Sequence, residues 1–331
     1  MELKKLGEFG LIEKIARSAG AGHPDVIKGI GDDAAVVRSS KTQCQLLTTD
    51  TLIEGIHFEP SHTTPFLLGK KCIAVNLSDI AAMGGTPVCF VVSLSIPPQT
   101  PYEFIHKLYQ GMIQRARAFG VSLAGGDTTA SKDRMVITIT LLGTARTDRV
   151  IYRHGARAGD AIYVTGFLGD AALGLALIKR RKALSRIQPL VKKHLDPMPR
   201  VAEGNRISRT RLASSMIDIS DGLLADLRHI LEQSQAGARI WLNRLPLSPQ
   251  YRQHWQEAAD DRYAPALCGG EDYELLFTVP PDKQKRVATL ERACGIPVTC
   301  IGEITGKKYE LKVLDEQNRE VAYGKEGFTH F

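Results

Sequence analysis

Aspartates beside glycine, serine or threonine recur along this sequence, and their chemistry suits a site for phosphate and a hard metal ion. Mg²⁺ prefers near-octahedral oxygen ligands at about 2.0 to 2.1 Å, and glycines let backbone amides approach phosphate oxygens without a Cβ in the way. The motifs are Gly29-Ile30-Gly31-Asp32-Asp33, Thr48-Thr49-Asp50-Thr51, Asn76-Leu77-Ser78-Asp79, Gly125-Gly126-Asp127-Thr128-Thr129 and Asp218-Ile219-Ser220-Asp221-Gly222. They predict carboxylates that hold metal, which in turn holds phosphate.

Two of these motifs have apolar surroundings. Asp33 is followed by the apolar run Ala34 to Val37, so we expect its carboxylate at the entrance to a buried strand, although a tight turn would also favour Gly and Asp. Asn76 and Asp79 are three residues apart and therefore share one face of an apolar helix. An unpaired carboxylate there would cost several kcal/mol of desolvation, so a cation or a strong hydrogen-bond partner is implied.

The other three motifs lie at predicted ends of strands. Thr48-Thr49-Asp50 ends an alternating strand and either joins a metal-water network or caps the next element. The Gly125-Gly126-Asp127 segment predicts a phosphate-Mg²⁺ loop, with a Gly-Gly hairpin turn as the alternative. Asp218 ends a strand, and either it points into the site or Ser220 or Asp221 merely caps the helix that follows.

Two further features suggest contacts with a substrate. Glu271-Asp272-Tyr273-Glu274 gathers three carboxylates around an aromatic ring just before an apolar strand. A solvated acidic turn is one interpretation, and a positively charged substrate is the other. His57, beside Phe58, is either a substrate contact or a structural histidine.

The elements that position these motifs mix strands and helices throughout, which predicts an α/β or α+β fold. A chain of 331 residues favours two cores, and we place the boundary near residue 150, giving domains 1–150 and 151–331. We predict helices at 65–83, 101–119, 166–178, 199–210, 222–233 and 282–293. We predict strands at 43–49, 88–96, 135–142, 161–165, 213–217, 238–242, 273–279, 297–302 and 309–314.

Composition argues against several classes of protein. The net charge of +7 is mild, aromatics are only 6%, and Lys179-Arg180-Arg181-Lys182 follows an apolar helical run, so we expect a solvated helix end and no nucleic-acid partner. The longest apolar stretches fall short of the roughly 20 residues that cross a bilayer, and the start is not apolar. We therefore predict a cytoplasmic protein without a membrane partner. No P-loop or Rossmann motif occurs.

The motifs, in this order, resemble those of the thiamine-monophosphate kinase family, in the superfamily of aminoimidazole-ribonucleotide synthetase and selenophosphate synthetase. The resemblance covers nearly the whole chain, from Gly7-Glu8-Phe9-Gly10 to Gly327-Phe328-Thr329-His330-Phe331. It implies a homodimer of two-domain α/β (α+β) subunits, with an N-terminal sheet domain that dimerises and a C-terminal α+β domain that completes the cleft. The implied reaction is transfer of phosphate from ATP, with several Mg²⁺ ions, to thiamine monophosphate.

The resemblance also implies roles for individual residues. The metal shell would comprise Asp33, Thr48, Thr49, Asp50, Asp79, Asp127, Asp218 and Asp221. ATP would contact Gly126, Asp127, Arg153 and Ser220, and the groups nearest the chemistry would be Asp50, Asp127 and Arg153. Thiamine monophosphate would contact His57, Glu271 and Phe328.

Three alternatives remain at this point. A selenophosphate synthetase or a purine-pathway ligase would share the superfamily fold, but the former uses a reactive cysteine near its start, whereas the first cysteine here is Cys44, within a predicted strand. A non-catalytic nucleotide-binding regulator would share the fold without turnover, but it should have lost metal carboxylates that are all present here.

Overall fold

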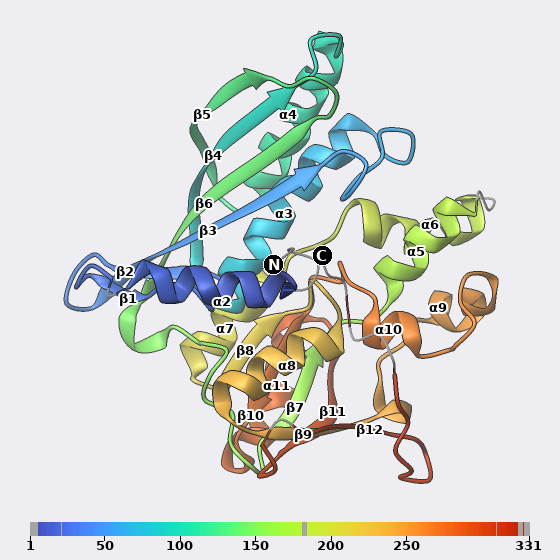
Figure 1. The fold of residues 1–331 in the computed structure, drawn as a ribbon. Helices are drawn as coiled ribbons and strands as arrows, with labels where there is room; N and C mark the ends of the chain where they lie inside the picture. Colours follow the sequence, from blue (N-terminus) through green and yellow to red (C-terminus); the bar gives the residue numbers. More distant parts are fainter. Residues whose placement is uncertain (1–5, 21, 181–183, 309, 324–326, 328–331) are drawn as a thin grey trace.

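The strands form two sheets, one above the other in Figure 1, and helices pack around both. The structure is a computed structural model that describes residues 6–20, 22–180, 184–308, 310–323 and 327. Each sheet has six strands among these residues. No helix within the described ranges is long and apolar enough to cross a membrane.

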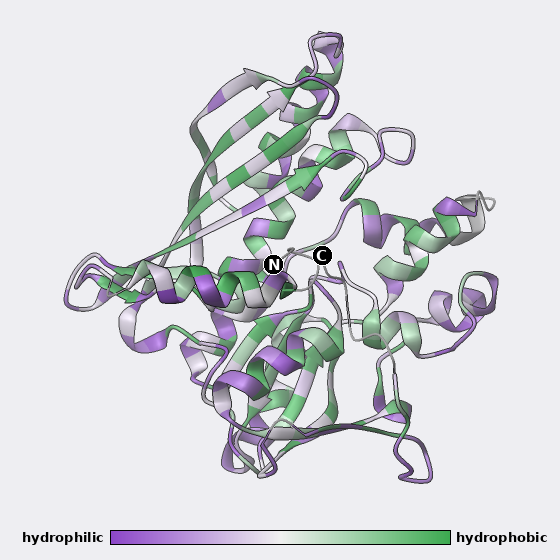
Figure 2. Cartoon of the chain, viewed as in Figure 1, coloured by the Kyte–Doolittle hydropathy of each residue, from purple (hydrophilic) through white to green (hydrophobic). Residues whose placement is uncertain are grey.

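The first sheet has the strand order β1-β2-β3-β6-β4-β5. Its strands are β1 (Val26–Lys28), β2 (Ala35–Arg38), β3 (Gln43–Ile53), β4 (Thr86–Ile96), β5 (Ser122–Ala130) and β6 (Val136–Arg146). All its pairings are antiparallel except that of β5 with β4, which is parallel. Burial alternates along β3, so one face of the strand packs on the core and the other is exposed. Figure 2 shows the matching bands of apolar and polar residues along these strands.

The strand β5 corrects one prediction. The Gly125-Gly126-Asp127 segment is not a loop but lies within β5, the edge strand, and every residue of β5 is exposed. Gly126 is needed for packing, because a Cβ there would lie 2.1 Å from the carbonyl oxygen of Val92 in β4. Parallel pairing with β4 thus explains this glycine without any phosphate.

The second sheet has the strand order β12-β9-β11-β7-β10-β8. Its strands are β7 (Ala161–Thr165), β8 (Ser215–Asp218), β9 (Gly237–Trp241), β10 (Leu275–Val279), β11 (Val298–Thr305) and β12 (Leu311–Leu314). Only β12 and β9 pair in parallel. The predicted strands of this half agree with the observed ones to within a few residues at each end.

The helices cover both sheets. They are α2 (Glu8–Ala19), α3 (Pro65–Ala82), α4 (Tyr102–Ala118), α5 (Asp170–Lys179), α6 (Leu184–Leu195), α7 (Val201–Thr210), α8 (Leu223–Ser234), α9 (Pro249–His254), α10 (Ala264–Cys268) and α11 (Val287–Cys294). The predicted helices at 65–83 and 101–119 correspond to α3 and α4. The predicted helix at 282–293 begins as a 3₁₀ helix, Pro281–Arg286, and continues as α11. α2, α6, α9 and α10 were not predicted.

Helix α3 joins the two halves of the molecule. Thr64 caps it by accepting a hydrogen bond from the backbone N–H of Leu67 at 3.2 Å, and Pro65 occupies its first turn. Most of its residues are buried because α4, α7, the first sheet and β8 all contact it. The core around α3 consequently includes Ile139 of β6 together with Met216 of β8. A second core, distinct from the first, fills the rest of the C-terminal half.

Candidate active site

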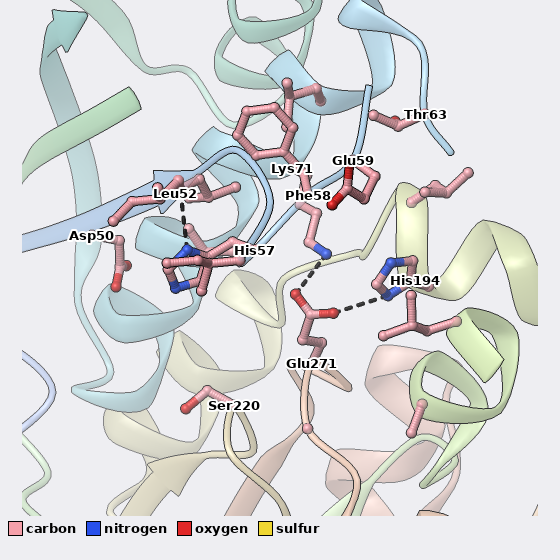
Figure 3. A pocket seen from close by; sticks show the side chains of 18 of the residues that line it. Asp50, Leu52, His57, Phe58, Glu59, Thr63, Lys71, His194, Ser220 and Glu271 are labelled. Atoms are coloured by element: carbon pink, nitrogen blue, oxygen red, sulfur yellow. Dashed lines mark hydrogen bonds and ion pairs between the residues drawn. The ribbon is translucent and has the colours of Figure 1, made fainter. Parts of the chain in front are cut away.

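A cavity of about 780 Å³ lies between the two halves of the molecule. The N-terminal half contributes Asp50, His57 and Lys71 to its walls, and the C-terminal half contributes Ser220 and Glu271. Figure 3 shows Asp50 and Ser220 toward one end and Glu271 between Lys71 and His194 toward the other. Predicted metal and substrate residues therefore face one space, although they come from distant segments of the chain.

Four aspartates predicted as metal ligands lie close enough for their charges to interact, namely Asp33, Asp50, Asp79 and Asp218. Of these four, Asp50 lines the cavity. Burial is the main cause that raises the pKa of Asp50 to about 6 and that of Asp218 to about 8. Burial also raises the pKa of Asp33 and, with the charges of Asp50 and Asp218, raises that of Asp79 well above its usual range. Desolvated carboxylates that repel one another favour protonation unless a cation compensates them.

The buried side chains of α3 supply part of this arrangement. The hydroxyl of Thr48 donates a hydrogen bond to Asp79, and that of Ser78 donates to Asp218 Oδ2 at 2.6 Å. Asp79 therefore has the strong hydrogen-bond partner that its apolar helix requires. Asn76 is fully buried, and its amide group donates to the carbonyl oxygen of Cys72 at 3.2 Å.

The two threonines before Asp50 point to opposite faces of β3. Thr48 is buried and its hydroxyl donates a hydrogen bond to Asp79, whereas Thr49 is exposed and its hydroxyl donates to the carbonyl oxygen of Ile139 at 3.1 Å. Alternation along a strand causes this difference. The hydroxyl of Thr49 is thus separated from that of Thr48 by the sheet, although Thr49 also lines the cavity.

Arg153 binds the first acidic motif. Its Nη2 lies 2.6 Å and its Nε 3.1 Å from Asp33 Oδ1, and its backbone N–H donates to Asp32 Oδ1 at 3.2 Å. Burial lowers the pKa of Arg153, but Asp33 and Asp32 outweigh burial and hold it above its usual value. The guanidinium predicted to contact ATP is therefore paired with a predicted metal ligand.

The donor set fits a hard cation, although it does not enclose one. Asp32 Oδ2, Asp33 Oδ2 and Asn76 Oδ1 are buried without a hydrogen-bond partner. Buried carboxylate and amide oxygens with free lone pairs are ligands that Mg²⁺ accepts. Across the described ranges, however, no three His, Cys, Asp or Glu side chains converge closely enough to hold a metal ion.

Asp226 fixes the loop after Asp218, although no motif in the sequence pointed to it. Its Oδ2 accepts hydrogen bonds from the backbone N–H groups of Ser220, Asp221 and Gly222 at 3.1, 3.2 and 3.1 Å. No side chain caps α8 at Gly222, so the interpretation of Ser220 or Asp221 as a simple N-cap is wrong. An acidic residue in the first turn of a helix was the available signal.

Within one chain, Asp127 lies apart from the other aspartates that were predicted as metal ligands. It lies opposite Ser93 on the exposed edge strand β5. It is not among the residues that line the cavity, and its charge does not contribute to the pKa shifts of the buried aspartates.

The acidic loop before β10 is buried rather than solvated, and its three carboxylates do different things. Asp272 accepts a hydrogen bond from the backbone N–H of Gly169, at the start of α5. Glu274 is fully buried and pairs with Arg200 and Lys193. Glu271 alone lines the cavity, where Lys71 and His194 flank it.

No sequence motif pointed to Lys71 or His194. Lys71 was one polar position in the predicted helix 65–83, and His194 lies in α6, which was not predicted. His57, which the sequence did indicate, lines the cavity, and its Nδ1 accepts a hydrogen bond from the backbone N–H of Ile53 at 3.0 Å. Phe328 lies outside the described residues.

Comparisons with known proteins agree over the whole chain. Residues 31–145 match the family "AIR synthase related protein, N-terminal domain", and residues 157–313 match "AIR synthase related protein, C-terminal domain". The thiamine-monophosphate kinase of Buchnera aphidicola subsp. Acyrthosiphon pisum is 37% identical over 330 residues, 99% of each chain. That of Escherichia coli (strain K12) is 37% identical over 328 residues, 98% of each chain.

A solved structure supports the same relationship. AaThiL complexed with AMPPCP and TMP superposes with a TM-score of 0.87 at 33% sequence identity, covering 100% of this chain and 99% of the other. The similarity therefore extends over both halves of the molecule.

Proposed function

The chain belongs to the thiamine-monophosphate kinase family, and from this premise we propose that it transfers the γ-phosphate of ATP to thiamine monophosphate, giving thiamine diphosphate and ADP. One observation of the structure carries this proposal. A single cavity has carboxylates suited to metal and phosphate at one end and Glu271, suited to a cationic substrate, at the other.

The nucleotide and its Mg²⁺ ions would occupy the end of the cavity near Asp50 and Ser220. When bound, Mg²⁺ would neutralise phosphate charge. The residues that would hold it are Asp33, Thr48, Thr49, Asp50, Asp79, Asp127, Asp218 and Asp221. Gly126, Asp127, Arg153 and Ser220 would contact ATP. The buried Asp33 Oδ2, which accepts no hydrogen bond, supports a cation there, whereas Asp32 Oδ2 lies 3.7 Å from Lys28 Nζ.

The acceptor would lie toward Glu271 and His57, with Phe328 as a third contact. A phosphate oxygen of thiamine monophosphate would attack the γ-phosphorus in line, forming a new P–O bond while the bond to the bridging oxygen of ADP breaks and its electron pair leaves with ADP. No activated nucleophile of the protein is needed, so the chain would act by positioning and by charge. Arg153 would add positive charge when Asp33 turns toward metal.

A second copy of the chain would cover the exposed face of the first sheet. The edge strand β5 has unpaired backbone groups, and exposed apolar side chains lie nearby at Leu47, Val88, Val91 and Leu123. A homodimer formed there would bury the strand that carries Asp127. Sedimentation should give a dimer for the native chain, and a monomer for Val91→Glu would support this face as the interface.

A coupled ADP-release assay with ATP and Mg²⁺ tests the proposed reaction. Thiamine monophosphate, free thiamine and no acceptor are compared, and the product is checked for thiamine diphosphate. We expect diphosphate from the monophosphate alone. ADP release that is independent of the acceptor, or no release, would contradict the proposal and favour the ligase or regulator alternatives.

A further inference from the structure

Glu271 is held at both carboxylate oxygens by side chains from two other segments. Lys71 Nζ of α3 lies 2.6 Å from Oε1, and His194 Nδ1 of α6 lies 2.9 Å from Oε2 (Figure 3). The side chains of Lys71 and His194 are 4% and 7% exposed, whereas that of Glu271 is 28% exposed. A carboxylate has about four acceptor positions. Glu271 therefore keeps acceptor capacity that opens on the cavity.

The backbone around Glu271 has an unfavourable conformation that orients the Glu271 carboxylate. Glu271 and Tyr273 have φ values of 71° and 49°, which are unfavourable for residues other than glycine. The loop is fixed by hydrogen bonds from the backbone N–H of Glu271 to Ser220 O and from that of Tyr273 to Ile219 O, both 2.8 Å. Such strain persists where the surroundings impose it, and it is concentrated at functional sites.

The electrostatics agree with this geometry. Burial alone would raise the pKa of Glu271, but Lys71 and His194 outweigh it and lower the pKa to about 2. Burial, followed by the charge of Lys71, lowers the pKa of His194, which therefore stays neutral near pH 7. His194 Nδ1 lies 2.9 Å from Glu271 Oε2 without the geometry of a hydrogen bond, so the neutral ring acts on Glu271 by close packing and by its dipole.

We propose that Lys71 and His194 are positioning residues for the acceptor substrate, because they hold the Glu271 carboxylate as an oriented acceptor. The ligand class is a heteroaromatic cation that carries an amino group, as thiamine monophosphate does. Its amino N–H would donate to Glu271, and its positive ring would face the carboxylate. This inference rests on the proposed function. Neither residue touches the reacting phosphates, so both should act on acceptor binding rather than on transfer.

The competing explanation is an ion pair that only joins the two halves of the molecule. Lys70 provides a matched control, because it is the neighbouring lysine on α3 and also pairs across the halves, with its Nζ 2.5 Å from Asp196 Oδ2. Lys70 does not line the cavity. A purely structural role predicts similar kinetic effects for Lys70 and Lys71, whereas a positioning role predicts an effect for Lys71 alone.

The test uses the full chain with saturating ATP and Mg²⁺. Lys71→Met should raise KM for thiamine monophosphate about tenfold or more, as expected for losing a charge-assisted hydrogen bond to its partner, and should change kcat and KM for ATP by less than about twofold. Lys70→Met should leave all three within about twofold. Lys71→Arg, which restores the charge, should recover most of the affinity. Calorimetric titration of thiamine monophosphate should show the same ranking in Kd without turnover.

The pH dependence separates the two explanations further. Without Lys71 the pKa of Glu271 rises, so the ratio of KM in Lys71→Met to KM in the native chain should grow as the pH is lowered from 8 to 5.5. Lys71 and His194 lower the pKa of Glu271, while Tyr273 interacts with the Glu271 charge and Lys179 with His194. His194→Phe should raise KM by a smaller factor, about threefold to fivefold. If Lys71→Met does not fold, the effect of His194→Phe on KM is the measurement that tests the inference.

Two results would overturn the inference while leaving the proposed function intact. One is diphosphate formation with an unchanged KM for the acceptor in Lys71→Met. The other is an equal change in KM for thiamine monophosphate in Lys70→Met and Lys71→Met, together with a ratio of variant KM to native KM that does not vary with pH. If the native chain neither forms thiamine diphosphate nor binds thiamine monophosphate, the proposed function and this inference both fail.

Discussion

The pKa values of buried carboxylates shift in opposite directions at the two ends of the cavity. At the end near Asp50, burial and mutual repulsion raise the pKa values of Asp50, Asp79 and Asp218. At the other end, Lys71 and His194 lower the pKa of Glu271 despite burial, and behind the cavity Lys193 and Arg200 do the same for the fully buried Glu274. The counter-charge that the chain provides outweighs burial only at the Glu271 end, because at the other end Arg153 pairs with Asp33 and the aspartate pKa values still rise. The other end is suited to a counter-charge that arrives with the ligand.

Glu274→Gln should give the largest change in stability, because it removes a charge that the chain has compensated. Glu274 is fully buried between Arg200, at 2.5 Å, and Lys193, at 2.7 Å. Removing one partner of a buried pair costs about 3 to 5 kcal/mol. Urea unfolding at pH 7 should show this loss, whereas Glu13→Gln, which breaks an exposed pair with Arg17, should show no measurable change.

The sign of the pH effect follows from the same pair. Burial raises the pKa of Glu274, but Lys193 and Arg200 outweigh it, so the pKa in the folded protein is below the usual 4.5. The stabilisation is therefore present above pH 4.5 and is lost as the pH falls through the lower pKa of the folded state. The stability difference between native and Glu274→Gln proteins should shrink below pH 4.5. A difference that stays constant down to pH 3 would contradict this assignment.

Asp50→Asn should show the reverse behaviour, with preserved stability and lost turnover. The substitution removes charge at nearly constant volume from a carboxylate that burial and neighbouring acids already destabilise. We expect kcat to fall about 10² to 10³-fold, as for the loss of one electrostatic contact to a transition state. Thermal unfolding without metal should be unchanged or higher. A loss of turnover below about tenfold would contradict the role of Asp50. Asp133→Asn, on the exposed loop after β5, is the control.

Asp127→Asn tests the edge strand in the same assay. Asp127 is exposed within one chain, so a comparable fall in kcat without loss of stability would indicate that a second subunit completes the site. A change below about tenfold would remove Asp127 from the proposed metal shell.

Glu271→Ala should have a smaller effect that is confined to the acceptor. It removes the acceptor atoms but leaves the carboxylates at the other end intact. We expect KM for thiamine monophosphate to rise about tenfold, which corresponds to about 1.4 kcal/mol. Glu59→Ala is the control, because Glu59 also lines the cavity but is exposed. An unchanged KM in Glu271→Ala would count against its substrate role.

Adding Mg²⁺ with a non-hydrolysable ATP analogue should give the smallest change, a rise in thermal stability. A ligand at ten times its dissociation constant stabilises the folded state by about 1.4 kcal/mol. The rise should disappear with a chelator and should be reduced in Asp50→Asn. It should persist in Glu271→Ala, because Glu271 lies at the opposite end of the cavity. Equal loss in both variants would mean that the two ends do not differ as proposed.

The sequence predicted most of the regular structure around the site. The helices α3 and α4 and the strands β3, β4 and β6 agree with the predicted segments, because apolar periodicity is strong there and Thr64-Pro65 marks a helix start. The strand β5 was not predicted. Its glycines have low strand propensity, and its extended conformation depends on pairing with β4, which lies far away in the sequence.

Residue types and local spacing by themselves determined which aspartates are candidates for metal and phosphate chemistry, because a carboxylate between small residues is recognisable without its neighbours. Only the tertiary structure decided which acidic groups have a basic side chain as a partner. Lys71, His194 and Arg200 reach their partners across separations of roughly 70 to 200 residues, and no local pattern records such contacts. Charge pairing at a buried site depends on distance in space and on desolvation, and folding alone sets both.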